Sequence, residues 1–240
     1  MIVLLIAALG LNPVVGIKGD AEYLRLDYFS AESLYVRQVS HDPDNAEVYW
    51  RLSRLFISMA DVSPHNDREG LYRKAESFAR KCVIADEKKA EGHTWLAASL
   101  GNIAMYEGGE TKVRLARDIR RELARALELN PSDDVAYSIL GSFYRALGGI
   151  SWIERQLANI LLGGIPDGGY PEAEAALRKA VALAPHVMRH QYEIGMLYRD
   201  WDRIDEAKNI LRKAASMPIT VRSDSTRVLE IQQFIAEEEE

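Results

Sequence analysis

Apolar residues along this chain recur every three to four positions over long stretches, which is the spacing of helices that bury one face. The pattern also repeats over a longer distance. Two sets of small and apolar residues lie 34 residues apart: Ala173, Leu177 and Ala180, then Ala207, Leu211 and Ala214. No stretch of useful length alternates apolar and polar residues as a strand would. The pattern therefore predicts an all-α chain in which similar helical units follow one another.

The units carry residues suited to a close pairing of two helices. An apolar-Gly-x-x-Tyr pattern occurs at 140–144 and again at 194–198. Glycine has no Cβ, so Gly141 and Gly195 would let the two helices of a hairpin approach closely. This pattern with a period of 34 residues is typical of tetratricopeptide repeats, which are helix hairpins. We therefore predict a tetratricopeptide-like α-solenoid, a superhelix of about four antiparallel hairpins with capping helices at both ends.

The first helices of successive units are more widely spaced in the first part of the chain. Steps of 44, 44 and 54 residues separate the equivalent positions Leu52, Leu96, Leu140 and Ile194. Turn-forming residues predict insertions near 61–64 and near 106–109, and a longer insertion over about 147–171.

The longest insertion has a helical pattern of its own. Ile153, Leu157, Ile160 and Leu161 share one helical face, with Trp152 at its start, and Ser151 is suited to cap the first turn. We therefore predict an extra helix over 151–162, inserted between the two helices of one repeat. At the ends of the chain, similar patterns predict an opening helix over 21–40 and a closing helix over 225–236, which cap the solenoid.

The first residues differ from the rest of the chain. Residues 2–11 form an apolar run, and a helix of ~15 Å would cover about half of a ~30 Å hydrocarbon core. The run matches the apolar part of a signal peptide, although no basic residue precedes it. We expect 1–17 to be an apolar, signal-like segment and 18–240 to be a single repeat domain. The expected location is exported, periplasmic or membrane-associated, and the alternative is a cytoplasmic chain with an apolar cap.

Composition and local motifs exclude several functions. The 240 residues carry a net charge of −6, opposite to the balance that nucleic-acid binding requires. Cys82 is the single cysteine, so neither an intrachain disulfide nor a cysteine-based metal site can form. The histidines lie in no metal-binding motif, and the sequence has neither a phosphate-binding loop nor a nucleophile elbow. We therefore expect a chain that is not an enzyme and has no catalytic residue, metal or cofactor.

Several blocks of the sequence resemble one known family. They are Glu-Val-Tyr-Trp-Arg-Leu-Ser-Arg at 47–54, Gly-His-Thr-Trp-Leu-Ala at 92–97, Ser-Trp-Ile-Glu-Arg-Gln-Leu-Ala at 151–158 and Tyr-Pro-Glu-Ala at 170–173. In this order, over about 45–218, the blocks are similar to the regulator of microtubule dynamics family. The resemblance implies a tetratricopeptide-like fold. Its animal members are linked to microtubules, mitochondria and membrane contact sites, and one has a lipid-binding repeat domain.

The first helix of each repeat lines the concave groove in tetratricopeptide arrays. Five residues are therefore predicted to line a partner-binding groove: Trp50, Arg54, Arg145, Tyr192 and Arg199. Arginines would give charge-assisted hydrogen bonds to an anionic or extended ligand, and aromatic rings would give contact area. The alternative is that the tryptophan packs between helices and the arginines pair with neighbouring carboxylates.

The predicted insert helix supplies two further candidates. Trp152 and Arg155 could contact a lipid or a partner, and the alternative is that the tryptophan anchors the insert on the solenoid. A basic stretch with Arg117, Arg121 and Arg125 on one helical face could contact phosphates. Because acidic residues are interleaved with these arginines, we predict a solvated face of salt bridges.

These features predict a non-catalytic scaffold that binds a protein or peptide in its concave groove. The alternative is a lipid-binding or lipid-transfer module, which would need a continuous apolar cavity lined across several repeats. Nucleic acid is not an expected partner. Microtubules are not expected either, because the apolar start indicates an exported, bacterial-type protein.

Overall fold

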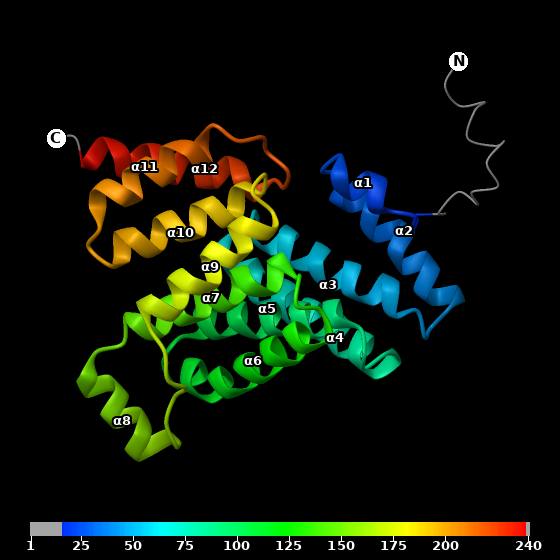
Figure 1. Ribbon diagram of the computed structural model, residues 1–240. Helices are drawn as coiled ribbons and strands as arrows, with labels where there is room; N and C mark the ends of the chain where they lie inside the picture. Colours follow the sequence, from blue (N-terminus) through cyan, green and yellow to red (C-terminus); the bar gives the residue numbers. More distant parts are fainter. Residues whose placement is uncertain (1–15, 239–240) are drawn as a thin grey trace.

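The computed structural model describes residues 16–238 of the chain, and this part contains twelve helices and no strand (Figure 1). The helices are α1 (Asp20–Leu24), α2 (Tyr28–His41), α3 (Ala46–Ala60), α4 (His65–Ala85), α5 (Ala90–Glu107), α6 (Gly109–Leu129), α7 (Asp134–Gly148), α8 (Trp152–Leu162), α9 (Tyr170–Leu183), α10 (Met188–Asp200), α11 (Ile204–Ala215) and α12 (Ser223–Glu237). Four hairpins form the body of the molecule, namely α3–α4, α5–α6, α7–α9 and α10–α11. The predicted all-α, tetratricopeptide-like solenoid is confirmed.

Two glycines set the close approach of the helices in the last two hairpins. A Cβ on Gly141 of α7 would lie 2.3 Å from Leu177 of α9, and a Cβ on Gly195 of α10 would lie 2.5 Å from Leu211 of α11. Both leucines are fully buried. No larger residue fits at either glycine without displacing the buried leucine opposite it.

Side-chain caps fix where several helices begin. The Asn45 side chain accepts the Val48 amide at the start of α3, and the Asp133 side chain accepts the Ala136 amide at the start of α7. These bonds satisfy amides that have no partner within the helix. Local sequence therefore fixes where α3 and α7, the first helices of two hairpins, begin.

The extra residues of the first two repeats are placed differently from the prediction. The second helices α4 and α6 are each 21 residues long, whereas α9 has 14 residues and α11 has 12. The additional residues therefore lengthen the second helices instead of forming separate inserts. Only the third insertion forms an element of its own, α8, which lies between α7 and α9 as predicted.

The opening of the chain also differs from the prediction of one helix over 21–40. The chain turns at Leu26, whose φ of 64° is left-handed, and Asp27 caps the new helix α2 by accepting the Ser30 amide. This break lets Tyr23 of α1 stack on Tyr28 of α2, with ring centroids 5.5 Å apart. Burial of two aromatic rings therefore outweighs helix continuity here.

The opening helices lie in contact with the segment that precedes α12, the last helix of the chain. The Arg222 backbone amide donates to the Tyr28 hydroxyl at 3.1 Å, and the Arg222 side chain donates to the Leu26 carbonyl at 2.8 Å. Val221 packs against the same aromatic cluster. The segment before α12 thus connects the last hairpin to the opening helices.

The predicted signal-like segment lies almost wholly outside the described residues. Among the described residues, no helix is both long and apolar enough to cross a membrane.

Candidate functional site

A cavity of about 890 Å³ lies between helices of the solenoid and the inserted helix α8. Helices α5, α6 and α7 form its walls and the inserted helix α8 forms one side, so the cavity extends across two repeats. Its apolar walls include Met105, Val113, Ile139, Phe143, Leu157 and Leu161. In Figure 1, α8 stands at the lower edge of the molecule, away from the other helices that line this cavity.

The far end of the cavity is polar. Arg145, Arg189 and Asp200 line it, and the Arg145 guanidinium lies 3.4 Å from the Asp200 carboxylate. The same guanidinium donates to Glu193 at 3.2 Å. Burial would raise the pKa of Glu193, but the nearby charges of Arg145, Arg189 and Arg227 outweigh burial and lower this pKa. The carboxylate is therefore ionised at neutral pH and balances the arginines at this end.

Of the five residues predicted to form the groove, Arg145 lines this cavity. Arg199 lies close by and donates to Asp200 at 2.9 Å, so both arginines share one carboxylate. Tyr192 lies apart from them and donates its hydroxyl to Glu230 of α12 at 2.6 Å.

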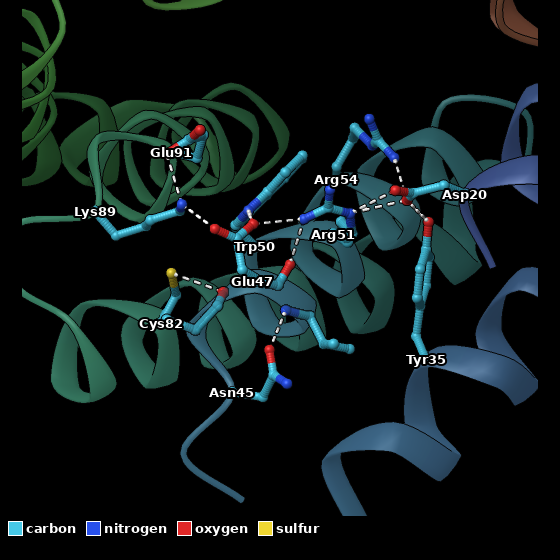
Figure 2. Close-up of polar contacts among 12 residues, drawn as sticks. Asp20, Tyr35, Asn45, Glu47, Trp50, Arg51, Arg54, Cys82, Lys89 and Glu91 are labelled. Carbon is cyan, nitrogen blue, oxygen red and sulfur yellow. Dashed lines mark hydrogen bonds and ion pairs between the residues drawn. The ribbon is translucent and has the colours of Figure 1, made fainter. Parts of the chain in front are cut away.

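Trp50 and Arg54 form a separate cluster on α3, near the start of the solenoid (Figure 2). The Arg54 guanidinium lies 3.9 Å from the centre of the Tyr23 ring and 5.0 Å from that of Trp50. Its charge is paired with Asp20 at 3.7 Å. The opening helices therefore cover Arg54, and the five residues fall into three groups instead of one site.

Arg51, which was not among the predicted residues, is the centre of the charge network in Figure 2. It donates to both carboxylate oxygens of Asp20, at 2.8 and 2.9 Å, and to Glu47 at 2.8 Å. Burial would raise the pKa of Glu47, but hydrogen bonds from Lys89, Arg51 and Trp50 hold it at about 2. These bonds join α1, α3 and the start of α5, so the network has a clear structural role.

The two candidates on α8 have different surroundings. Trp152 is 73% exposed and so is not held in the core. Arg155 donates to the carbonyls of Leu147, Pro166 and Gly168 at 3.1–3.5 Å. Arg155 therefore joins the last turn of α7 to the loop that follows α8, while the tryptophan is exposed to solvent.

The basic stretch on α6 is partly a face of salt bridges, as predicted. Arg121 pairs with Asp118 at 2.6 Å, and Arg125 pairs with Glu87 at 2.9 Å. Arg117 differs, because no acidic partner lies near it among residues 16–238.

Reactive chemistry has little support in the described part of the chain. Residues 16–238 contain no group of three or more histidine, cysteine or acidic side chains that could hold a metal ion. Burial raises the pKa of the Cys82 thiol to about 12, and this thiol donates to the Ala46 carbonyl at 3.3 Å. Such a thiol is inert, because the thiolate is the reactive form.

The apolar walls of the cavity were not predicted from the sequence. The available signal was the insert helix 151–162, whose apolar residues extend over most of its circumference. A helix that is apolar on more than one side needs more than one apolar neighbour. This signal could have indicated a cavity beneath the helix.

The sequence matches the family model of regulator of microtubule dynamics proteins 1–3 over residues 20–238. The chain belongs to this family. It is 26% identical to regulator of microtubule dynamics protein 1 of Bos taurus over 220 residues, which is 90% of this chain and 69% of that protein. It is also 26% identical to protein 2 of Bos taurus over 193 residues, which is 80% of this chain and 47% of that protein. The chain thus spans about half the length of the second relative.

A solved structure supports the fold. The crystal structure of a thermophilic tetratricopeptide protein from Thermus thermophilus superposes with a TM-score of 0.67, covering 91% of this chain and 95% of that chain. The two sequences are 20% identical, so this likeness concerns the fold alone. Family and fold together identify this chain as a tetratricopeptide-like repeat protein.

Proposed function

We propose that this chain is a non-catalytic scaffold whose cavity holds the hydrocarbon chain of an amphipathic lipid. The mainly apolar lining of the cavity, contributed by helices from α5 to α8, carries this proposal. Its volume of about 890 Å³ lies within the range of roughly 300–1,000 Å³ that is usual for small-molecule sites. The lipid alternative among the expectations from sequence therefore has the stronger support.

The polar end of the cavity suits the headgroup. Arg145 and Arg189 offer guanidinium donors there, and Ser142 and Asn102 offer neutral polar groups. Because Glu193 and Asp200 partly balance the arginines, the headgroup that fits best carries at most a small negative charge. A carboxylate or a single phosphate meets this condition.

The test is binding of saturated fatty acids of increasing chain length, measured by displacement of a fluorescent fatty acid. Each buried methylene contributes about 0.8 kcal/mol, so affinity should rise roughly fourfold per carbon until the cavity is full. Ala146, which lines the cavity and is exposed, can be changed to Trp to fill the space without disturbing the core. Ala146→Trp should weaken binding at least roughly tenfold.

The matched control is Ala182→Trp, which adds the same side chain at an exposed position of α9 outside the cavity. It should bind fatty acids as the unchanged protein does. An affinity that does not depend on the chain length of the fatty acid would count against the lipid cavity. An equal loss of fatty-acid affinity in Ala146→Trp and Ala182→Trp would also count against it.

A protein or peptide ligand is the second candidate, because the rim of the same cavity carries exposed polar residues. Glu110 and Lys112, two exposed residues of α6, supply these polar groups. An amphipathic helix could place its apolar face in the cavity and its polar face toward these residues. Arg199→Glu should then weaken capture of such a partner, with little effect on fatty-acid binding, because the Arg199 side chain is 40% exposed and lies outside the cavity lining.

We also propose that the protein is exported, on the basis of the apolar run at 2–11. Intact mass of the chain purified from its own host tests this proposal. A mass short of the first residues is expected, and a full-length mass in the cytoplasmic fraction would argue against export.

A further inference from the structure

Helix α8 exposes an unusual number of large apolar side chains for a surface helix. Residues 16–238 include fourteen large hydrophobic side chains that are strongly exposed, and six of them lie in the eleven residues of α8. Trp152, Ile153 and Ile160 are 73%, 64% and 76% exposed. Scattered single residues of this kind are normal on a protein surface, whereas a cluster marks an interaction site.

The helical positions divide α8 into two apolar faces. Leu157, Ala158, Leu161 and Leu162 contribute to the cavity lining. Trp152, Ile153 and Ile160 do not line the cavity, and their positions on the helix place them on the side that faces solvent. The outward face is therefore available for a partner even when the cavity is occupied.

A set of arginines lies beside the end of α8. Arg117 approaches Gly163, the residue that ends α8, to within 3.4 Å of where a Cβ would stand. Arg117 and Arg120 also line a hollow with Ile165 and Pro166, in the loop that follows α8. Arg117 and Arg120 of α6 thus lie next to the C-terminal end of the apolar helix α8.

The charge of this region is opposite to that of the whole chain. Residues 109–125 have a net charge of +3, whereas the complete chain has −6. Arg114, Arg117 and Arg120 are exposed, and within residues 16–238 no carboxylate pairs with them. Asp118, an acidic residue in the same stretch of α6, is already paired with Arg121.

We propose that the outward face of α8 and the three arginines of α6 form a docking surface for an anionic lipid bilayer. Trp152, Ile153 and Ile160 enter the interfacial region of the bilayer, where an amphipathic helix lies in the membrane plane. Arg114, Arg117 and Arg120 contact the phosphates of anionic headgroups. This surface is called the α8 surface below.

Charge complementarity selects this occupant. A second copy of the chain would bring two positive α8 surfaces together, and like charges would repel. A bilayer with anionic lipids provides both the apolar phase and the negative charge that the two halves of the surface require. The proposal does not depend on what the cavity binds, because it concerns the opposite face of α8.

Flotation of the full chain with lipid vesicles tests the proposal. Vesicles of phosphatidylcholine alone are compared with vesicles of phosphatidylcholine and phosphatidylglycerol. We expect binding to the mixed vesicles that weakens as salt is raised, because salt screens the arginines. Trp152→Ser with Ile160→Ser, and separately Arg117→Glu with Arg120→Glu, should each lower the partition coefficient at least roughly tenfold.

Two matched variants separate the α8 surface from general effects. Ile84→Ser with Leu229→Ser removes apolar side chains that are 85% and 65% exposed on other helices. Arg37→Glu with Lys88→Glu makes the same change of charge at exposed positions elsewhere. Both control variants should bind vesicles as the unchanged protein does. All variants retain residues 1–17, so differences between them do not arise from that apolar segment.

The proposal is overturned if the α8 variants bind like their controls, or if the unchanged protein binds neither kind of vesicle. It is also overturned if sedimentation shows a dimer that only the α8 variants abolish, because a second copy would then occupy the surface. Fatty-acid binding measured on the same samples tells the two proposals apart. If a variant loses vesicle binding but keeps its affinity for fatty acids, the change acts on the α8 surface and not on the cavity. If a variant loses fatty-acid affinity but keeps vesicle binding, the change acts on the cavity and not on the α8 surface.

Discussion

Gly141 and Gly195 occupy equivalent places in the first helices of two repeats, and each lies against a buried leucine of the second helix. Their sequence pattern was recognisable because the absence of a side chain has a direct geometric effect. The arginines behave differently. Arg54, Arg145 and Arg199 were predicted as free groove residues or as ion pairs, and the structure pairs each of them with a carboxylate.

Replacing Gly141 by alanine should destabilise the protein. The new Cβ would lie 2.3 Å from the Leu177 side chain, so this fully buried leucine must be displaced at a cost of about 1–3 kcal/mol. Gly101→Ala is the control, because no atom lies within 4 Å of a Cβ there and alanine favours a helix by up to about 1 kcal/mol. Urea denaturation measures both. Similar free energies of unfolding in the two variants would contradict the close approach inferred here.

At the scale of elements, a buried ion pair joins the two helices of the second hairpin. The His93 Nδ1 on α5 lies 2.7 Å from the Glu122 carboxylate on α6, and Nε2 lies 2.9 Å from the Glu87 carbonyl. The hydrogen bond to Glu122 raises the pKa of His93. Burial would raise the pKa of Glu122, but hydrogen bonds from His93 and Arg121 outweigh burial and lower it.

The two pKa shifts predict how stability depends on pH. The contribution of His93 is complete below its ordinary pKa of 6.5 and is lost as pH rises through the raised value. The contribution of Glu122 is complete above 4.5 and is lost as pH falls through the lowered value. The pair should therefore stabilise the fold most between these two values.

We expect the free energy of unfolding to fall by an amount on the order of 1 kcal/mol as pH rises from about 6 to about 8. In His93→Gln this fall should be smaller, because glutamine does not titrate. Urea denaturation across this pH range checks the difference between the two proteins. An equally steep fall in both would assign the pH dependence to other groups.

At the scale of the whole molecule, residues far apart in the sequence hold the two ends of the solenoid together. Arg222 and Tyr28 are 194 positions apart and share a hydrogen bond. Most repeat proteins depend on contacts between neighbouring units. This contact instead makes the opening helices and α12 depend on each other.

Tyr28→Phe combined with Arg222→Ala should loosen both ends together. The change removes two hydrogen bonds that contribute roughly 1 kcal/mol each, so amide exchange in α1 and α12 should quicken roughly tenfold or more. Exchange in α5 and α6 should stay the same. Arg25→Ala is the control, because Arg25 is paired with Glu22 on its own helix. Unchanged exchange in the double variant would show that apolar packing alone holds the ends.

The sequence by itself determined the helical class, the hairpin repeat and the inserted helix over 151–162, because these follow from local periodicity and from contacts between neighbouring helices. It did not determine the break at Leu26, where the stacking of Tyr23 on Tyr28 overrides helix continuity. The carboxylate partners of the arginines, the cavity under α8 and the contact of Arg222 with Tyr28 came only from the tertiary structure. Each of these features depends on how helices distant in sequence are placed in space. The spacing of residues along the chain determines local helix formation but does not determine that placement.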